Sequence, residues 1–199
     1  VATGYGRVSV PYADKMITEI TCHAMGAVWI FDNKDMTIID IGGQDTKIIC
    51  VEQGFVKDFM MNDKCSAGTG RFLEIMANTL SMRPNEMCEL AREGSGVTIS
   101  SMGTVFAESE VISLIGQGEK KENIAFAVVD SIVRKVAAQA NRMSEDRPML
   151  CLTGGLCECS YISEALTKEL GMEVKTDPQS RYAGAIGAAL GAVKKGKKN

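Results

Sequence analysis

The sequence predicts an α/β fold in which a mixed sheet carries helices on both faces. Three short strand-like segments, 37–41, 46–52 and 55–61, follow one another with only tight turns between them, and the first two are rich in β-branched residues. After them, helical and strand-like segments alternate along the chain. Strands joined by tight turns form an antiparallel meander, whereas alternating helices and strands build parallel pairs with crossover helices. The expected order of elements is therefore βββαβαβα.

The first expected element is a helix over residues 14–31, where apolar side chains recur at helical spacing. The three strands come next, joined by the turn at Gly42-Gly43 and by the pair Gln53-Gly54, which is typical of a hairpin.

A helix is expected from about Thr69, and Pro84 suits the first turn of the following helix. The remaining pattern predicts strands at residues 97–100, 149–153 and 172–176, and helices at residues 104–115, 119–143, 161–170 and from 177 onward. No internal repeat or low-complexity linker interrupts this order.

Composition narrows the class of protein. Of the 199 residues, 45% are hydrophobic and 24% charged, which excludes disordered and fibrous classes. A net charge of −3 and a pI near 5.3 argue against nucleic acid as a partner. The seven cysteines lack the spacing of a disulfide framework, so a reducing cytoplasm is the expected location. No segment is apolar for the roughly 20 residues that a membrane span requires.

The turn at Gly42-Gly43 is a candidate phosphate site. Glycines let backbone amides approach phosphate oxygens, Asp40 and Asp45 can hold Mg²⁺ through water, and Gln44 can position an attacking water. Asp40, Gln44 and Asp45 are therefore the candidate catalytic residues. The alternative is a plain hairpin turn in which both glycines serve only to adopt positive φ.

A second strand ends in Gly154-Gly155, where a flat base or ribose could lie against bare backbone. Glycine pairs after strands are common, so this pair alone is weak evidence for a nucleotide site. It gains weight from the turn at Gly42-Gly43. The sequence contains neither a P-loop nor a Rossmann fingerprint, which calls for a different nucleotide-binding fold.

Cys65 stands at the mouth of the helix expected after Thr69. Free amides of Gly68, Thr69 and Gly70 and the helix dipole would favour a thiolate, so Cys65 could be a nucleophile, a metal ligand or an iron–sulfur ligand. The alternative is an inert core cysteine, which is the common role of a lone thiol.

Six segments are distinctive: ATGYGR, CHAMGA, DIGGQDTKII, MNDKCSAGTGRFLEIMA, TVFAESEVISLI and LTGG. Together they resemble the ATP-dependent activators of 2-hydroxyacyl-CoA dehydratases and the related ATPase subunits of benzoyl-CoA reductases. The resemblance implies the fold of actin, heat-shock chaperones and the acetate and sugar kinases, and βββαβαβα corresponds to one ribonuclease-H-like lobe of it. It also implies a homodimer that works under anaerobic conditions in the cytoplasm.

The resemblance implies roles for the candidate residues. Asp40, Gly42, Gly43, Gln44 and Asp45 would form the second phosphate loop for ATP or ADP with Mg²⁺. Gly154 and Gly155 would form the adenosine loop, and Cys65 would ligate a 4Fe–4S cluster shared by two subunits. A ferredoxin or flavodoxin would be the electron donor, and an acyl-CoA dehydratase or reductase the acceptor.

Two departures from the family pattern stand out. The family's second cluster cysteine precedes TVFAESEV, where this chain has Ser101-Met102-Gly103, so Gly103 occupies the expected ligand position. The family's first phosphate loop has no counterpart in this sequence. We therefore expect either a fragment of a longer protein or a relative that no longer hydrolyses ATP.

The expected organisation has three parts. Residues 1–34 would be a remnant of an N-terminal lobe with its connecting helix, residues 35–176 the C-terminal ATPase lobe, and residues 177–199 a closing helix with a basic tail. Two alternative functions stay open: a small-molecule kinase or ATPase of the same superfamily without a cluster, and a nucleotide-binding module without catalysis.

Overall fold

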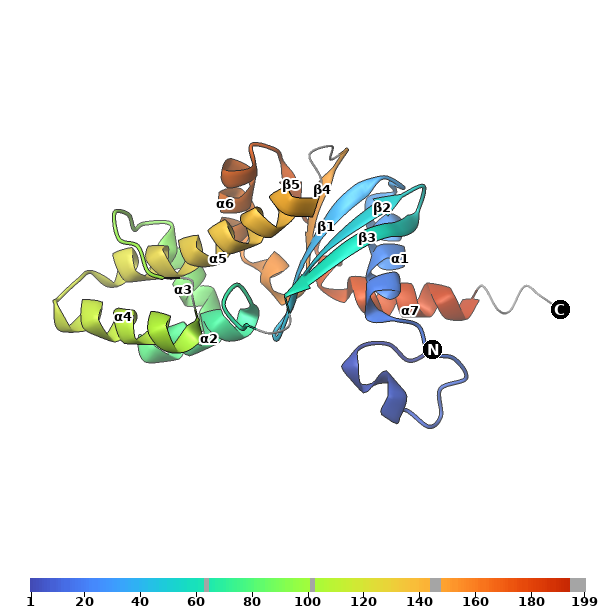
Figure 1. Cartoon of the computed structure of the whole chain (residues 1–199), viewed down its shortest axis with the longest axis horizontal. Helices are drawn as coiled ribbons and strands as arrows, with labels where there is room; N and C mark the ends of the chain where they lie inside the picture. Colours follow the sequence, from blue (N-terminus) through green and yellow to red (C-terminus); the bar gives the residue numbers. More distant parts are fainter. Residues whose placement is uncertain (63–64, 101–102, 144–147, 194–199) are drawn as a thin grey trace.

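The computed structural model describes residues 1–62, 65–100, 103–143 and 148–193. Its centre is a five-stranded sheet with the order β3-β2-β1-β4-β5 (Figure 1). The strands are β1 (Met36–Ile41), β2 (Thr46–Glu52), β3 (Phe55–Asn62), β4 (Leu150–Thr153) and β5 (Val174–Lys175). β1, β2 and β3 pair antiparallel, whereas β4 pairs parallel with both β1 and β5. The predicted meander and mixed sheet are confirmed.

Seven α-helices are described: α1 (Glu19–Phe31), α2 (Gly70–Thr79), α3 (Pro84–Ala91), α4 (Thr104–Gly116), α5 (Lys121–Met143), α6 (Ser160–Leu170) and α7 (Ala183–Val193). Helices α2 to α5 lie between β3 and β4 in the chain, and α6 lies between β4 and β5. This order agrees with the predicted βββαβαβα. Within the described residues, no helix is both long and apolar enough to cross a membrane.

Both faces of the sheet are buried at its central strands β1 and β4, whereas the edge strand β3 is largely exposed. Ile38 and Ile49 pack on one side with residues of α1, while Ile39 and Ile48 pack on the other side with residues of α2 and α5. Neighbouring residues of a strand point to opposite faces, so a strand covered on both sides is apolar at nearly every position. This explains the continuous β-branched run in β1.

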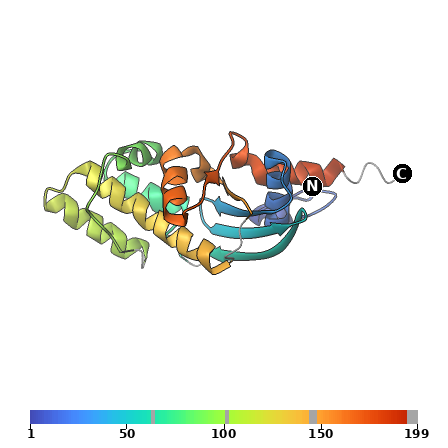
Figure 2. The ribbon, with the colours of Figure 1, turned by 90° about the horizontal axis from the view of Figure 1, so that it is seen from above.

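Helices α1 and α7 cross on one face of the sheet with their backbones in contact (Figures 1 and 2). A Cβ atom added to Gly26 would lie 1.9 Å from the carbonyl oxygen of Ala183, and one added to Gly187 would lie 1.8 Å from that of Cys22. Only glycine permits such an approach. The two helices are therefore held together as one unit.

The other helices form a second group, which extends beyond the sheet (Figure 1). In both views, α4 and the first half of α5 lie to one side of the strands, and the second half of α5 returns to the sheet. The turn between β1 and β2 lies at the boundary between sheet and helices.

The start of the first predicted helix and the strand predicted at residues 97–100 are wrong. The first helix begins at Glu19 and not at residue 14, because Thr18 caps it by accepting a hydrogen bond from the amide of Thr21, at 3.3 Å. Before the cap, Met16 forms a parallel bridge with Ala2. Residues 97–100 form no strand, because they cross the helical group away from any sheet edge, where the amide of Ser100 donates to Oε2 of Glu110 at 2.7 Å.

The end of the chain differs in detail from the prediction. A turn at Asp177 and a short 3-10 helix, Ser180–Tyr182, precede α7, so the last helix begins later than residue 177. Residues 194–199, which contain the predicted basic tail, lie outside the described residues. The division into residues 1–34, 35–176 and 177–199 stays a prediction.

We expect Gly26→Ala to destabilise the fold by about 1–3 kcal/mol, because the added methyl group meets the backbone of α7. Gly116→Ala is the matched control, since no heavy atom of its surroundings lies within 4 Å of the new Cβ. Urea unfolding monitored by circular dichroism gives the comparison. Equal midpoints for the two variants would contradict the close contact between α1 and α7.

Candidate nucleotide site

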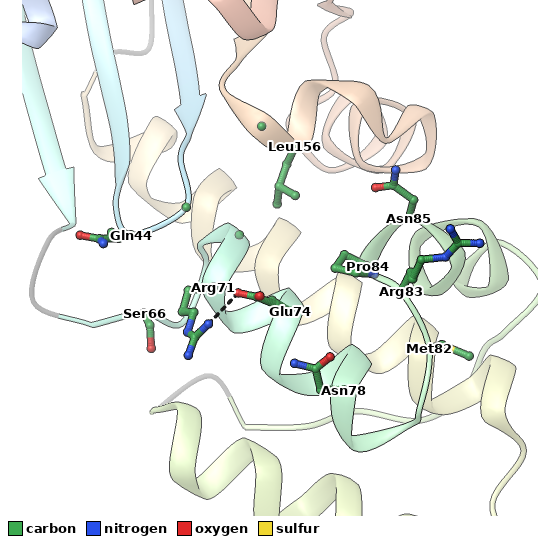
Figure 3. Close-up of a pocket in the computed structure, with 13 residues that line it drawn as sticks. Gln44, Ser66, Arg71, Glu74, Asn78, Met82, Arg83, Pro84, Asn85 and Leu156 are labelled. Atoms are coloured by element: carbon green, nitrogen blue, oxygen red, sulfur yellow. Dashed lines mark hydrogen bonds and ion pairs between the residues drawn. The ribbon is translucent and has the colours of Figure 1, made fainter. Parts of the chain in front are cut away.

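One glycine of each pair lines the same cleft, which has a volume of about 920 Å³. Gly43 and Gln44 line it from the turn after β1, and Gly155 and Leu156 line it from the loop after β4. Figure 3 shows the side chain of Leu156 pointing into the space between this turn and the start of α3. Segments far apart in the sequence are therefore brought to one place.

The turn does not have the conformation of a plain glycine hairpin. Neither Gly42 nor Gly43 has a positive φ, so the alternative in which they only supply that backbone conformation is wrong. Gly43 is exposed, and no heavy atom lies within 4 Å of the place where its Cβ would be. Its backbone thus faces open space in the cleft.

Two hydrogen bonds tie this turn to α2. The amide of Gly70 donates to the carbonyl of Gly42 at 2.9 Å, and the amide of Arg71 donates to the carbonyl of Gly43 at 2.8 Å. The first amides of a helix have no partner inside the helix, and here the turn supplies two of their acceptors. The turn and the start of α2 therefore move together.

Gly154 is required by its position at the end of β4. Its φ is +81°, and an added Cβ would lie 2.4 Å from the carbonyl oxygen of Ile41 and 2.7 Å from Oδ1 of Asp40. Thr153 donates a hydrogen bond to the same Asp40 oxygen at 3.0 Å. The ends of β1 and β4 are thereby locked, and the exposed Gly155 is left facing the cleft.

A buried charge network lies behind the turn. Asp40 and Lys47 are each only 2% exposed, and they face each other across the register of β1 and β2. Nζ of Lys47 lies 2.5 Å from Asp45, 3.1 Å from Glu19 and 3.5 Å from Asp40. One ammonium group is therefore shared by three carboxylates.

His23 completes the network from α1. Its Nε2 lies 3.3 Å from Oδ1 of Asp40, and its Nδ1 lies 3.2 Å from the carbonyl oxygen of Glu19. Both partners accept hydrogen bonds, so both ring nitrogens carry protons in this arrangement. His23 is then a cation that pairs with Asp40.

The pKa directions agree with this geometry. Burial disfavours the charged form of His23, but its hydrogen bond to Asp40 and the charge of that carboxylate outweigh it and raise the pKa of His23. Burial alone would raise the pKa of Asp40, yet His23, Lys47 and Thr153 hold it below its usual value. The pKa of Lys47 is raised by the three carboxylates in spite of burial.

His23, Lys47 and Glu19 were not among the site residues predicted from the sequence. For Lys47 a signal existed, because a hairpin that turns at residues 42–45 pairs position 47 with position 40 across the strands. For His23 and Glu19 there was none, since their role depends on where α1 crosses the sheet.

Glu19, His23 and Asp40 form the one group of three metal-ligating side chains found in the described part of the chain, with ligand atoms within 4.8 Å of one another. The ammonium group of Lys47 binds Glu19 and Asp40 directly. The protein's own cation therefore neutralises these carboxylates.

Cys65 is half-buried beside α5, where Nζ of Lys135 lies 3.6 Å from its Sγ. The next residue, Ser66, makes a short hydrogen bond to Thr104, so Cys65 lies near Gly103 at the start of α4. Ser101 and Met102 lie outside the described residues.

The prediction of free amides around Cys65 is wrong for two of the three groups. The amide of Thr69 donates to the carbonyl of Ser66 at 3.0 Å, and that of Gly70 donates to Gly42. They are used to fix the loop and the turn, because the chain folds back on itself before α2.

The strand order, the helices on both faces and a cleft between two glycine pairs define an actin-like ATPase fold. A structure of MreB 5 from Spiroplasma citri bound to AMPPNP shares this fold, with a TM-score of 0.56 and 16% identity over 92% of this chain and 62% of that chain. The sequence profile of the BadF/BadG/BcrA/BcrD ATPase family matches residues 1–192. The chain belongs to this family.

Two relatives are much more similar. The (R)-2-hydroxyglutaryl-CoA dehydratase activating ATPase of Acidaminococcus fermentans is 48% identical over all of this chain and 76% of its own length. The crystal structure of that dehydratase's component A superposes with a TM-score of 0.93, covering 99% of this chain and 76% of that one. A second structure, of the activator of the 2-hydroxyisocaproyl-CoA dehydratase from Clostridium difficile with bound ADPNP, superposes with a TM-score of 0.90. It is 38% identical and covers 99% of this chain and 76% of that one.

We predict that His23→Gln lowers stability most at acidic to neutral pH. A raised pKa of His23 in the folded state stabilises the fold below the unfolded value of about 6.5. This stabilisation is lost as the pH rises through the folded-state pKa. The charged groups that face His23 are Asp40 on β1, Lys47 on β2 and Glu19 on its own helix.

Urea unfolding of both proteins between about pH 5.5 and pH 9 tests this. The difference in free energy between wild type and His23→Gln should shrink as the pH rises, by up to roughly 1.4 kcal/mol for each unit by which the pKa is raised. A difference that grows with pH would show that His23 is neutral in the fold.

Proposed function

We propose that this protein is an ATP-dependent activator that couples nucleotide hydrolysis to the reductive activation of an acyl-CoA dehydratase or a benzoyl-CoA reductase-type enzyme. One observation carries the proposal. The carbonyls of the Gly42-Gly43 turn accept hydrogen bonds from the first amides of α2, and α2 begins at Gly70, five residues after Cys65. A nucleotide bound at the turn would therefore change the position of the segment that contains Cys65.

In this proposal the cleft binds ATP or ADP. The amide of Gly43 would approach the phosphates, because that of Gly42 already donates to the carbonyl of Asp45 at 2.9 Å. Gly155 would leave room for the adenosine, whereas Gly154 is packed against the end of β1. Gln44 is exposed at the cleft, which suits the orientation of an attacking water. The wall of the cleft and the close relative with bound ADPNP support these roles.

The residues present also suit Mg²⁺. Oδ2 of Asp45 is buried and has no hydrogen-bond partner among the described residues. It would therefore accept a hydrogen bond from a water bound to Mg²⁺. Asp40 is engaged by His23, Thr153 and Lys47. We therefore assign the metal-bound water to Asp45, and to Asp40 the task of keeping this network in place. Mg²⁺ would neutralise phosphate charge during hydrolysis.

A 4Fe–4S cluster does not fit the residues present. Such a cluster usually takes four cysteine thiolates. Cys65 offers one, and Gly103, which lies near it, offers no side chain. Two copies of the chain would supply two thiolates, so no electron-transfer step is assigned to a cluster held by these residues.

We assign the partner contacts to helix α4, which begins near Cys65. Helix α4 exposes large apolar side chains: Val105, Phe106, Ile112 and Ile115. Exposed apolar patches mark contacts with other proteins. This supports a homodimer, as well as contacts with an acyl-CoA enzyme and with a ferredoxin or flavodoxin donor in the cytoplasm.

Gly103 favours a second candidate function, a small-molecule kinase or ATPase of the same superfamily that works without a cluster. A nucleotide-binding module without catalysis is the third. Phosphate release from ATP, measured with and without added acyl-CoA enzyme, separates the activator from both.

The nucleotide site is tested by Gly43→Val and Gly155→Val. Both new side chains would enter open space in the cleft, so the fold should tolerate them while ADP binding weakens about tenfold or more, which corresponds to roughly 1.4 kcal/mol. Gly6→Val is the matched control, because Gly6 is exposed and has the same open surroundings outside this cleft. Calorimetric titration with MgADP gives the affinities. Unchanged affinity in both cleft variants would refute the assignment.

Iron binding is tested by Gly103→Cys. The φ of Gly103 is 166°, which any residue adopts, and the nearest heavy atom to an added Cβ is Cδ2 of Phe106 at 3.8 Å. After anaerobic incubation with iron and sulfide, this variant should hold about four iron atoms per pair of chains, and the wild type well below that. Gly116→Cys, at the other end of α4, is the control. About four iron atoms per wild-type pair would show that other ligands complete the cluster.

A further inference from the structure

Helix α1 touches the nucleotide turn through two charged contacts. Oε1 of Glu19 lies 3.1 Å from Nζ of Lys47, and Nε2 of His23 lies 3.3 Å from Oδ1 of Asp40. Both contacts come from the first two turns of α1. They join α1 to β1 and β2, at the end of the hairpin that carries Gly42 and Gly43.

Lys47 connects α1 to both sides of the turn. Its ammonium group lies 2.5 Å from Asp45, which follows the glycines, and 3.5 Å from Asp40, which precedes them. Because Lys47 is almost fully buried, these interactions are weakly screened by solvent. A change of charge at Asp45 is therefore felt by Asp40 and Glu19.

Helix α1, which carries Glu19, is itself packed against two neighbouring segments. Its backbone is in contact with α7 at Gly26 and Gly187. Directly before it, the amide of Ile17 donates to the carbonyl of Ala2 at 3.0 Å, which ties residues 1–18 to the start of α1. A shift of α1 would move both neighbours.

We propose that Lys47 and His23 are positioning residues that couple occupancy of the Gly42-Gly43 turn to the position of α1. The inference rests on the proposed function, because it requires a nucleotide with Mg²⁺ at the turn. A cation held near Asp45 weakens the attraction of that carboxylate for Lys47. Lys47 then interacts more strongly with Glu19 and Asp40, and α1 is drawn toward the hairpin.

The chain contains its own probe for this movement. Trp29 is its single tryptophan, and it lies on α1 with 54% of its surface exposed. It is ten residues from Glu19, or about 15 Å along the helix axis, and it does not line the nucleotide cleft. A fluorescence change on nucleotide binding would therefore report on α1 and not on direct contact.

The experiment compares the wild type with Glu19→Gln and His23→Gln. Glu19→Gln removes only the α1 end of the Lys47 contact, and Lys47 keeps Asp40 and Asp45 as partners, so this variant should fold. Glu52→Gln is the matched control, because Glu52 pairs with Lys57 on the surface of the same sheet. Binding of MgADP is measured by equilibrium dialysis, and Trp29 emission is titrated in parallel.

We expect Trp29 emission of the wild type and of Glu52→Gln to change with the midpoint given by dialysis. Glu19→Gln and His23→Gln should still bind MgADP but lose most of the Trp29 response. A purely structural role would lower their thermal stability and leave the response of the folded protein unchanged.

The outcomes separate the two claims. If MgADP does not bind the wild type, the proposed function and this inference both fail. If MgADP binds but Trp29 does not respond, or responds equally in Glu19→Gln and the wild type, the inference alone is overturned. Should His23→Gln fail to fold, Glu19→Gln still decides between these results.

Discussion

The pair of backbone hydrogen bonds from Gly70 and Arg71 to the Gly42-Gly43 turn is the constraint on which the rest of the structure depends. Backbone bonds of this kind cannot be replaced by another side chain, and they fix the distance between a sheet and a helix. They also consume the helix amides that an anion would otherwise use. The turn itself is therefore left as the surface that a phosphate group can approach.

The second constraint is electrostatic. Three carboxylates close together repel one another, and burial makes that repulsion expensive unless cations are present. Lys47 and His23 supply those cations from different elements, so the charges can be satisfied only when α1, β1 and β2 are all in place. The same network that neutralises Asp40 thus specifies how the first helix docks on the sheet.

The sheet could be predicted from the sequence because its signal is local. The β-branched runs and the turns at Gly42 and Gly54 define the meander without knowledge of distant residues. The strand predicted at residues 97–100 was wrong because Val97 and Ile99 alternate there with polar residues as they would in a strand. This pattern looks the same whether the segment joins a sheet or crosses a group of helices. The helix predicted to begin at residue 14 begins later, because helical spacing of apolar residues does not show which residue will be the N-cap.

The candidate site was partly predictable for a similar reason. Glycines and carboxylates with recognisable chemistry indicated Asp40, Gly43 and Gly155, whose neighbourhood in space follows from adjacent parallel strands. Lys47 and Glu19 look like ordinary surface residues in the sequence. Their importance comes from the crossing of α1 over the hairpin, which is a tertiary property.

The open backbone at Gly103 has an evolutionary consequence. A thiol at this place would strain neither φ nor packing, and glycine and cysteine codons can differ by a single base. A cysteine ligand at position 103 could therefore be lost or regained by one nucleotide substitution, without a change in folding stability on which selection could act. Among descendants of a common ancestor, metal content would then be a poor guide to kinship.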